Sequence, residues 1–193
     1  MKLIIASNNA HKICEIKKIL SGKFDEILSL REAGVTHETV EDGQTFMENA
    51  LKKAREITEI TGYAALADDS GICVDSLGGA PGIYSARYAS SMCCNASDEA
   101  NNALLLANLR DKEDWSAHYT SAIALVYPDG REVCAEGYMY GKIIDTPRGE
   151  GGFGYDPIFV MDGETRTVAE MSAEEKNAVS HRAKALQALL LKL

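Results

Sequence analysis

The sequence Ala-Ala-Leu-Ala-Asp-Asp-Ser-Gly at residues 64–71 runs from an apolar segment directly into two neighbouring carboxylates. Its first four residues predict a buried strand, and the small residues that follow, up to residue 88, predict loops. Because the side chains of a strand alternate between two faces, Asp68 and Asp69 enter one cleft only if the strand ends before them. Either both residues are turn formers, or one is structural while its neighbour holds magnesium or activates water.

The composition indicates a globular chain with an excess of acidic residues. Its 193 residues, 46% of them hydrophobic, suffice to bury a sizeable core in one domain over residues 1–193. The formal net charge of −9 would repel a nucleic-acid polymer, whereas a divalent cation and a few lysines can still bind a small polyanion. No apolar run approaches the roughly 20 residues that span a bilayer, and the first residues do not resemble a signal peptide. We therefore expect a cytoplasmic protein with no nucleic-acid or membrane partner, whose five cysteines are reduced thiols.

Hydrophobic periodicity predicts a mixed α/β protein. Strands are expected at 2–6, 64–67, 116–127, 131–143 and 158–160, and helices at 11–20, 45–61, 97–110 and from 172 onward. Thr45 and Glu48 fit a capping box, and Gly62 supplies the stop of that helix. The turn Pro128-Asp129-Gly130 makes a long hairpin of residues 116–143, so the sheet includes antiparallel strands.

Several polar residues lie where they could reach a ligand. The turn at residues 7–9 opens a helix whose first turn carries Lys12, which favours an anion; ordinary capping by Asn8 or Asn9 is the alternative. Asn49 and Lys53 are four residues apart on the next helix and share a face that can reach a ligand, while Phe46, Ala50, Ala54 and Ile57 occupy the face that packs. Glu41 lies ahead of that helix and is either an oxygen ligand or part of a turn.

A glycine-rich loop at residues 149–157 carries two aromatic side chains, Phe153 and Tyr155. They could bring a ring and backbone amides against a flat base. The alternative is that they fill the space between the loop and the core.

The basic residues near the C-terminus predict a helix break. On one unbroken helix Lys176, His181 and Arg182 would not converge. Ser180 is a good N-cap, so a helix that restarts there places His181 and Arg182 in its first turn. Cations at a helix N-terminus oppose its dipole, which predicts a compensating ligand or carboxylate. A solvated basic stretch in a continuous helix is the alternative.

Over nearly the whole chain these segments resemble the house-cleaning nucleotide pyrophosphatases that hydrolyse inosine and xanthosine triphosphates and their deoxy forms. Residues 7–12 are similar to the Thr/Ser-Gly-Asn-x-x-Lys loop of that family, and residues 45–53 to its Thr-Phe-x-Glu-Asn-Ala helix with the lysine that follows. Residues 67–71 match its Ala-Asp-Asp-Ser-Gly motif. Phe-Gly-Tyr-Asp-Pro at 153–157, then Lys176 and Ser-His-Arg at 180–182, complete the family's order.

The resemblance implies a role for each of these residues. Asp69 would be the general base and would hold Mg²⁺ together with Glu41, and Lys12, Lys53 and Ser70 would lie near the phosphates. The nucleoside end would be held by Phe153, Gly154, Tyr155, Asp156, Lys176, His181 and Arg182, with Phe153 stacked on the base. Further substrate contacts are expected from Ser7, Asn8, Asn9 and Asn49. The resemblance also implies a homodimer.

Two positions depart from the family's pattern. Asn8 stands where the family usually has glycine, and asparagine tolerates the left-handed backbone conformation better than most residues. Asp42 replaces a threonine that is common after the glutamate, which adds a carboxylate beside the expected metal ligand.

Together these observations predict an elongated, two-lobed α/β fold with a twisted mixed β-sheet, flanking helices and a nucleotide cleft between the lobes. The expected reaction converts ITP, dITP and XTP to the monophosphate and pyrophosphate, with Mg²⁺ and attack of water on the α-phosphorus. The N–H groups of His181 and Arg182 would donate hydrogen bonds to the 6-oxo oxygen of such a base. The 6-amino group of adenine would find no acceptor there and would stay unpaired. Two alternatives remain: a pyrophosphatase for modified pyrimidine or methylated nucleotides on a similar fold, and a nucleotide-binding regulator without catalysis.

Overall fold

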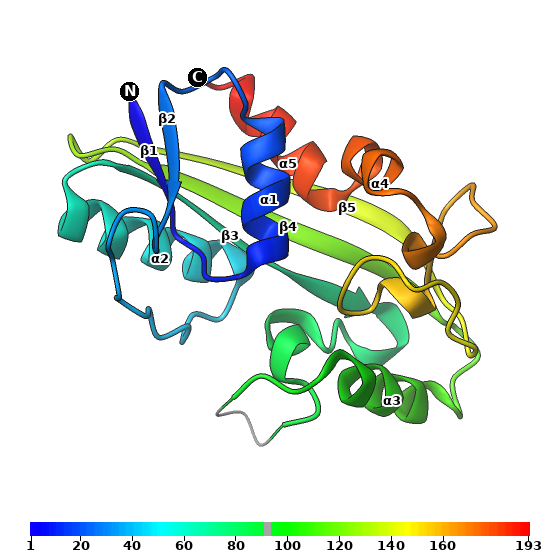
Figure 1. Ribbon diagram of the computed structural model, residues 1–193. Helices are drawn as coiled ribbons and strands as arrows, with labels where there is room; N and C mark the ends of the chain where they lie inside the picture. Colours follow the sequence, from blue (N-terminus) through cyan, green and yellow to red (C-terminus); the bar gives the residue numbers. More distant parts are fainter. Residues whose placement is uncertain (91–93) are drawn as a thin grey trace. The chain divides into compact units, whose positions relative to one another are not determined.

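The computed structural model describes residues 1–90 and 94–193 (Figure 1). Its strands are β1 (Lys2–Ile5), β2 (Glu26–Ser29), β3 (Ala64–Val74), β4 (Ser116–Val126), β5 (Glu132–Ile143) and β6 (Phe159–Met161). Its α-helices are α1 (Ala10–Ile19), α2 (Phe46–Thr61), α3 (Asp98–Leu109), α4 (Ala173–Val179) and α5 (His181–Leu190). The sequence therefore predicted the type of each of these elements except the short strand β2.

The strands form one mixed sheet in the order β2-β1-β3-β4-β5-β6. β1 is parallel to both β2 and β3, with Leu3 paired to Ala64, while β5 and β6 are antiparallel, with Gly141 paired to Met161. The mixed sheet with flanking helices is confirmed. The elongated outline and the cleft between lobes stay predictions.

The chain divides into two compact units, and β3, β4 and β5 contribute residues to both. The first unit contains residues 1–69, 121–137 and 181–193, and the second contains residues 70–120 and 138–180. Whether the chain is one domain, as the sequence predicts, stays a prediction.

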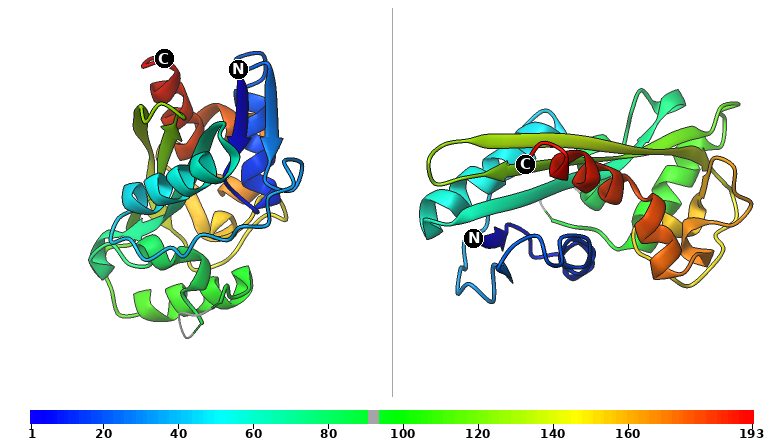
Figure 2. Two further views of the ribbon diagram at one scale, coloured as in Figure 1. Left: turned by 90° about the vertical axis from the view of Figure 1, so that its left-hand side faces the viewer. Right: turned by 90° about the horizontal axis from the view of Figure 1, so that it is seen from above.

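In the first unit both faces of β1 are covered. Leu3 and Ile5 pack in a cluster with side chains of α1 and α5, whereas Ile4 packs in a separate cluster with α2. Helix α2 lies on one side of β1 and α1 on the other (Figure 2). A strand buried on both faces reads as a continuous apolar run, and residues 3–6 are such a run.

The second unit has its own core, in which α3 packs with the strand ends assigned to this unit. Leu105 and Leu109 of α3 are fully buried in a cluster with Ile72 of β3 and Phe159 of β6. These side chains pack α3 against the strand ends of this unit.

Helix α2 begins and ends at the predicted residues. Thr45 accepts a hydrogen bond from the backbone N–H of Glu48 at 3.1 Å, and Gly62 closes the helix in the left-handed conformation with φ 68°. The expected capping box is only half formed. The Glu48 carboxylate accepts from the N–H of Gln44 at 2.7 Å, one residue before the position that a capping box uses.

The strand that carries the two aspartates does not end at them, so their interpretation as turn formers was wrong. β3 continues to Val74 because Gly71 lets the strand pass close to Ser85, whose hydroxyl accepts from the N–H of Ile72 at 2.9 Å. A Cβ at Gly71 would collide with that hydroxyl. This glycine therefore serves a close approach rather than a turn.

The break predicted near the C-terminus is confirmed. Helix α4 ends at Val179, Ser180 is extended with ψ 154°, and α5 starts at His181. His181 and Arg182 therefore occupy the first turn of α5. The continuous terminal helix was the wrong alternative.

Two further expectations concern thiols and membranes. Cys14, Cys73 and Cys134 are free thiols, as predicted, while Cys93 lies outside the described residues. No helix in the part of the chain that the structure describes is long and apolar enough to cross a membrane.

Candidate active site

Asp68 and Asp69 point to opposite faces of β3 because they are neighbours in a continuous strand. Asp68 is 1% exposed, and it accepts a hydrogen bond from the Ser121 hydroxyl at 2.5 Å. Its other oxygen lies 2.8 Å from the Lys12 ammonium and 3.2 Å from a guanidinium nitrogen of Arg182. Each oxygen of this buried carboxylate thus has at least one strong donor.

Arg182 joins this network from the first turn of α5. It is 1% exposed and also forms an ion pair with Glu15 of α1, the helix that lies beside α5. The sequence predicted a ligand or carboxylate that compensates the cations of this turn, and the structure supplies two carboxylates, Asp68 and Glu15. Whether Arg182 also contacts a nucleoside stays a prediction.

The charges around Asp68 keep it ionised. Burial alone would raise the pKa of this carboxyl, but Arg182 and Lys12 hold it well below its usual value. Burial would likewise lower the pKa of Arg182, and Asp68 and Glu15 raise it instead. Asp68 is therefore a fixed anion that organises α1, α5 and β3.

Asp69 takes part in a different cluster on the other face of β3. One of its oxygens lies 3.1 Å from the Lys53 ammonium, and the other accepts from the Asn49 side-chain amide at 3.2 Å. Lys53 also contacts Glu41 at 2.6 Å and the backbone oxygen of Asp68 at 3.0 Å. Residues predicted from separate segments of the sequence are thus brought together around one ammonium group.

Asn49 connects this cluster to the segment before α2. Its side-chain oxygen accepts from the N–H of Gly43 at 2.8 Å, and the Asn49 amide is fully buried. A Cβ at Gly43 would meet the side-chain oxygen of Asn49 at 2.7 Å, so only glycine allows this approach. Asn49 therefore fixes both Asp69 and the loop that carries Glu41.

The environments of the two aspartates shift their pKa values in opposite directions. Burial is the main reason that the pKa of Asp69 is raised, and it outweighs the attraction of Lys53 and Lys12. Burial opposes the charge of Lys53, but Asp69 and Glu41 raise its pKa. A carboxyl with a raised pKa is better suited to accept a proton than its ionised neighbour Asp68.

Glu41 and Asp69 fit a magnesium site of modest size. Both carboxylates already face one cation, the Lys53 ammonium, at 2.6 and 3.1 Å. Within residues 1–90 and 94–193 no group of three or more His, Cys, Asp or Glu side chains could hold a metal ion. Mg²⁺ commonly uses only one or two carboxylates and completes its shell with waters and substrate phosphates, so this donor set is compatible with it.

The turn before α1 is held by its own side chains. Asn9 caps the helix by accepting from the N–H groups of His11 and Lys12 at 3.0 and 3.1 Å, and Ser7 accepts from the N–H of Asn9 at 3.2 Å. This is the capping that the sequence left open as an alternative, while Asn8 is exposed. The predicted contacts of this turn with phosphate stay predictions.

In the second unit the structure brings together Phe153, Asp156 and Lys176. The Lys176 ammonium lies 2.6 Å from the Asp156 carboxylate and 4.3 Å from the centroid of the Phe153 ring. Asp156 is 2% exposed and also accepts from the N–H of Phe153 at 2.9 Å and from the Tyr119 hydroxyl at 3.4 Å. The Phe153 ring is only half-buried, so it is not a core plug, and a cation stabilises one side of it.

Tyr155 differs from Phe153 because it is buried. Its hydroxyl donates to the backbone oxygen of Ser85 at 2.8 Å, and burial raises its pKa beyond the usual range. Tyr155 therefore fills space between the loop and the core, and its predicted contact with a nucleoside stays a prediction. Ser70, the remaining predicted contact, follows Asp69 on β3 and belongs to the second unit.

Sequence reasoning missed four residues that contact the predicted site residues. Glu15 pairs with Arg182, Ser121 donates to Asp68, and Asp98 and Asn102 contact the backbone of Gly154. Glu15 was detectable in part, because the basic turn at 181–182 required a carboxylate from elsewhere. The other three look like ordinary helix or strand residues in the sequence. Their roles depend on contacts between segments that are far apart along the chain.

The mixed sheet and the buried lysine between two carboxylates define an α/β protein with a candidate acid–base site. The chain belongs to the Ham1 family, whose model matches residues 3–192. It is 50% identical over 190 residues to the dITP/XTP pyrophosphatase of Geobacter sulfurreducens. The aligned region covers 97% of this chain and 94% of that protein. It is 48% identical over 203 residues to the protein of the same name from Streptomyces coelicolor, with 98% and 95% covered.

Two solved structures share the fold. The Ham1 protein of Staphylococcus aureus has a TM-score of 0.89 and 38% identity, covering 100% of this chain and 97% of that one. The nucleoside-triphosphatase / dITP/XTP pyrophosphatase of Mycobacterium abscessus has a TM-score of 0.79 and 48% identity, covering 98% and 99%. The family resemblance inferred from the motifs is therefore confirmed.

Proposed function

We propose that this protein hydrolyses the non-standard purine triphosphates dITP, XTP and ITP to the monophosphate and pyrophosphate. The observation that carries the proposal is the cluster of Lys53, Glu41 and Asp69 on one face of β3. The names of relatives at 48–50% identity support the substrate class. Such substrates belong to the cytoplasmic nucleotide pool, and we place the protein there on that ground.

Asp69 is the proposed general base. Its raised pKa and its hydrogen bond from Asn49 leave a carboxylate oriented to take a proton from water that attacks the α-phosphorus. Asp69 and Glu41 are the proposed ligands of Mg²⁺, which when bound would neutralise phosphate charge. Lys53 and Lys12 would offset the remaining negative charge, and both must give up carboxylate contacts in part to do so.

The loop around Phe153 is the proposed site for the base. A half-buried aromatic ring beside the Lys176 ammonium suits a flat heterocycle, and the neighbouring backbone of Gly154 allows close approach. Asp156 and Tyr155 hold this loop from below. His181, Arg182, Ser70 and the turn of Ser7, Asn8 and Asn9 remain proposed substrate contacts.

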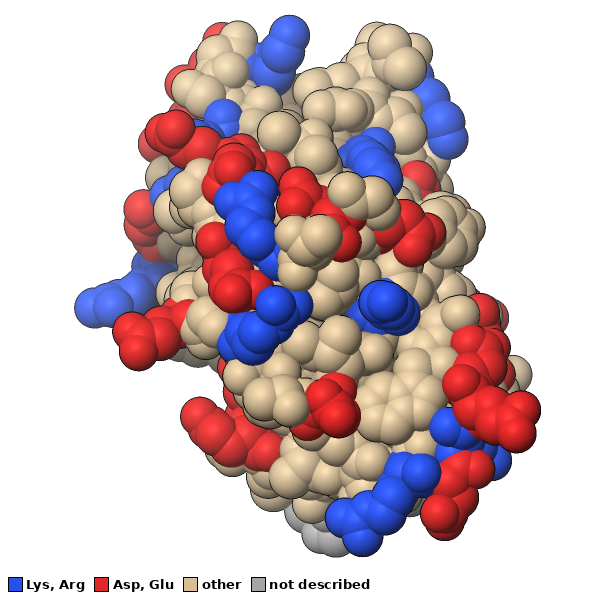
Figure 3. Space-filling model, turned by 90° about the vertical axis from the view of Figure 1, so that its right-hand side faces the viewer, with Lys and Arg blue, Asp and Glu red and all other residues tan. Residues whose placement is uncertain are grey.

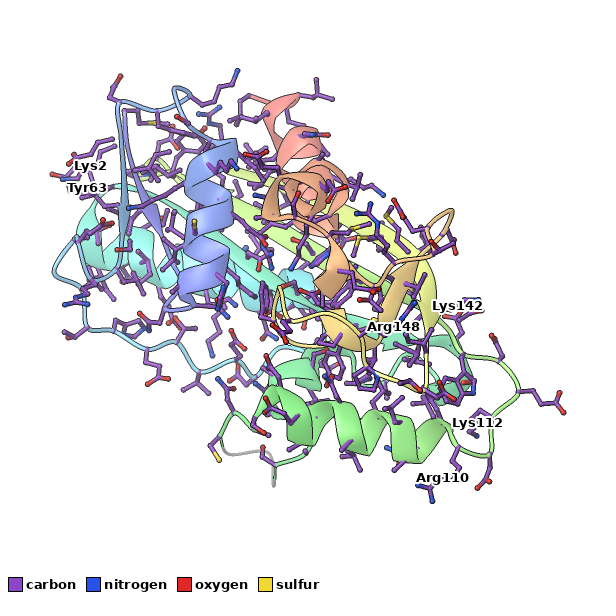
Figure 4. The ribbon with its side chains drawn as sticks, turned by 45° about the vertical axis from the view of Figure 1, so that its right-hand side comes forward. Lys2, Tyr63, Arg110, Lys112, Lys142 and Arg148 are labelled. Carbon is purple, nitrogen blue, oxygen red and sulfur yellow. The ribbon has the colours of Figure 1, made fainter. Side chains whose placement is uncertain are left out.

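A small nucleotide is favoured over a polymer. On the face drawn in Figure 3, basic side chains are intermixed with acidic ones. Arg148, labelled in Figure 4, donates to the backbone oxygen of Thr165 at 2.9 Å and lies 3.7 Å from Glu170. Paired charges of this kind do not provide the continuous basic surface that a nucleic-acid backbone needs.

The variant Asp69→Asn tests the proposal. It keeps the side-chain shape but cannot accept the proton, so turnover of ITP should fall about 10²–10⁴-fold while nucleotide binding persists. Pyrophosphate release and equilibrium binding are measured on the same preparation. Normal turnover in this variant would remove Asp69 from the mechanism.

The same measurements separate the alternatives. A regulator binds nucleotide but releases no pyrophosphate, and the wild-type protein would then behave as Asp69→Asn does. A pyrophosphatase for modified pyrimidines or methylated nucleotides would ignore ITP. The buried acid–base cluster favours hydrolysis, because a sensor has no need of a group that activates water.

We further propose a homodimer that uses an aromatic surface of the second unit. His118, Tyr138 and Tyr140 form this surface: the rings of Tyr138 and Tyr140 lie 6.1 Å apart at 23°, and that of His118 lies 5.4 Å from Tyr140. Tyr140 is 56% exposed. Asp75 lies 3.8 Å from His118, and Lys142 follows Tyr140 on the exposed face of β5. A surface that carries both charges can pair with its own copy across a twofold axis.

Light scattering after size-exclusion chromatography tests the dimer. Tyr140→Glu should give a monomer, because a carboxylate on the aromatic surface would face its own copy. The matched control is Tyr63→Glu, an exposed tyrosine of the first unit that lies beside Lys2 (Figure 4). A monomeric wild type, or a dimeric Tyr140→Glu protein, would contradict this surface.

A further inference from the structure

Helix α3 makes two contacts with the backbone of a single residue, Gly154, in the loop at residues 149–157. The N–H of Gly154 donates to the Asp98 carboxylate at 2.6 Å, and the Asn102 side-chain amide donates to the Gly154 oxygen at 3.2 Å. Asp98 and Asn102 are four residues apart on α3 and therefore share one face of the helix. Gly154 is thus held on its donor and on its acceptor by the same helix.

The loop needs such support because it has little regular structure of its own. Gly152 and Gly154 adopt the left-handed conformation, with φ 74° and φ 65°. Glycines lose more conformational freedom on ordering than any other residue, so a glycine-rich loop is ordered only if contacts with its surroundings oppose that loss. The Asp98 and Asn102 contacts are directed at the centre of this loop.

Asn102 has a feature that simple packing does not explain. It is only 9% exposed, and within the described residues its side-chain oxygen has no hydrogen-bond partner. A buried acceptor without a partner costs stability, and an apolar residue of similar size would avoid that cost. The hydrogen bond from the Asn102 amide to Gly154 offsets this cost.

The backbone that α3 holds is adjacent to the residue that carries the aromatic ring. Phe153 precedes Gly154, and its N–H donates to Asp156, which in turn binds Lys176. A Cβ at Gly152 would collide with the Asp156 carboxylate, so the loop lies tightly around this group. Release of the Gly154 backbone would therefore loosen the segment that places the Phe153 ring beside the Lys176 ammonium.

We propose that Asp98 and Asn102 are positioning residues that hold the loop at 149–157 in the conformation that binds the base. The inference rests on the proposed function, since it assigns this loop to the base. Loss of a contact lowers the fraction of molecules with a competent loop, and the apparent dissociation constant rises by the same factor. At saturating substrate the loop is ordered again, so kcat changes little while KM rises.

Asp98→Ala is the primary variant, because Asp98 is exposed and its loss leaves no buried gap. We expect its KM for ITP to rise about tenfold with kcat within about twofold of wild type. Asp98→Asn keeps an acceptor oxygen, so its KM should lie close to that of wild type. Glu99→Ala, an exposed acid on the same turn of α3, is the matched control and should match wild type. Asn102→Ala should shift KM in the same direction.

Hydrogen exchange of the amides at 149–157 gives a second readout that needs no catalysis. Exchange in Asp98→Ala should be about tenfold faster than in wild type and in Glu99→Ala. A lower kcat with unchanged KM, or unchanged exchange in this loop, would overturn the proposal. If wild type releases no pyrophosphate from any triphosphate, the proposed function fails, while exchange and ITP binding by these variants still decide the role of α3.

Discussion

Arg182 shows how much of the first unit depends on a single side chain. Its guanidinium joins Glu15 and Asp68, two residues of α1 and β3, and all three are buried or nearly so. Removing one partner of a buried ion pair leaves the others charged in a poorly solvated place. The network therefore makes a specific prediction about stability.

Arg182→Leu should lower the free energy of unfolding by about 3–5 kcal/mol, because Asp68 and Glu15 lose their shared cation. Urea denaturation followed by circular dichroism measures this change. Lys184→Leu, an exposed cation on the same helix, should change it by less than about 1 kcal/mol. Equal unfolding midpoints for wild type and Arg182→Leu would show that the network contributes little.

Glu32 provides a prediction about pH. Its carboxylate contacts the Lys17 ammonium at 2.6 Å and the N–H and hydroxyl of Ser29 at 2.7 Å, and these contacts lower its pKa from 4.5 to about 2. Because the pKa is lower in the folded state, the stabilisation is fully present above pH 4.5 and is lost as the pH falls towards 2.

The variant Glu32→Gln should therefore be less stable than wild type near neutral pH, and this difference should shrink between about pH 5 and about pH 3. Urea unfolding at several pH values measures it. Glu113→Gln, at an exposed loop position, supplies the control series. A difference that stays constant over this range would mean that the Lys17 and Ser29 contacts do not shift the titration of Glu32.

At the scale of the elements, close backbone approach explains the placement of α5. A Cβ at Gly137 of β5 would collide with the backbone oxygen of His181 and the nitrogen of Ala185. The first turn of α5 therefore lies directly on the strand. This contact fixes the position of the backbone that carries Arg182.

Gly137→Ala should force α5 away from β5 and lower the free energy of unfolding by about 1–3 kcal/mol, the usual cost of overpacking. Thermal unfolding measures the change. Glu136→Ala, one position earlier on the exposed face of β5, is the control and should leave the unfolding temperature nearly unchanged. Equal unfolding temperatures for the two variants would show that α5 does not pack closely against Gly137.

Local sequence signals predicted the elements well where their causes are local. Thr45, Gly62 and Ser180 act through hydrogen bonds and backbone conformations within a few residues, so their patterns were sufficient. The extent of β3 was mispredicted because it depends on Ser85, which lies well after the aspartates. A glycine that permits close approach looks like a turn former in the sequence alone.

Across the full chain, the family motifs identified most of the candidate site residues, but not the contacts that organise them. Glu15 and Arg182 are 167 positions apart, and Ser121 and Asp68 are 53 apart. Such pairs carry no periodicity or spacing that a single sequence reveals. What alternation along a strand did predict was that the two aspartates would differ, and their opposite environments bear this out.

Pyrophosphate release by the wild-type protein with Mg²⁺ tests the proposed hydrolysis most directly. Inosine, deoxyinosine, xanthosine, adenosine, guanosine and thymidine triphosphates are compared, and the nucleotide product of each is identified. We expect rapid release from the inosine, deoxyinosine and xanthosine substrates, with the monophosphate as product and little release from the others. Equal release from all six, a diphosphate product, or binding without any release would contradict it.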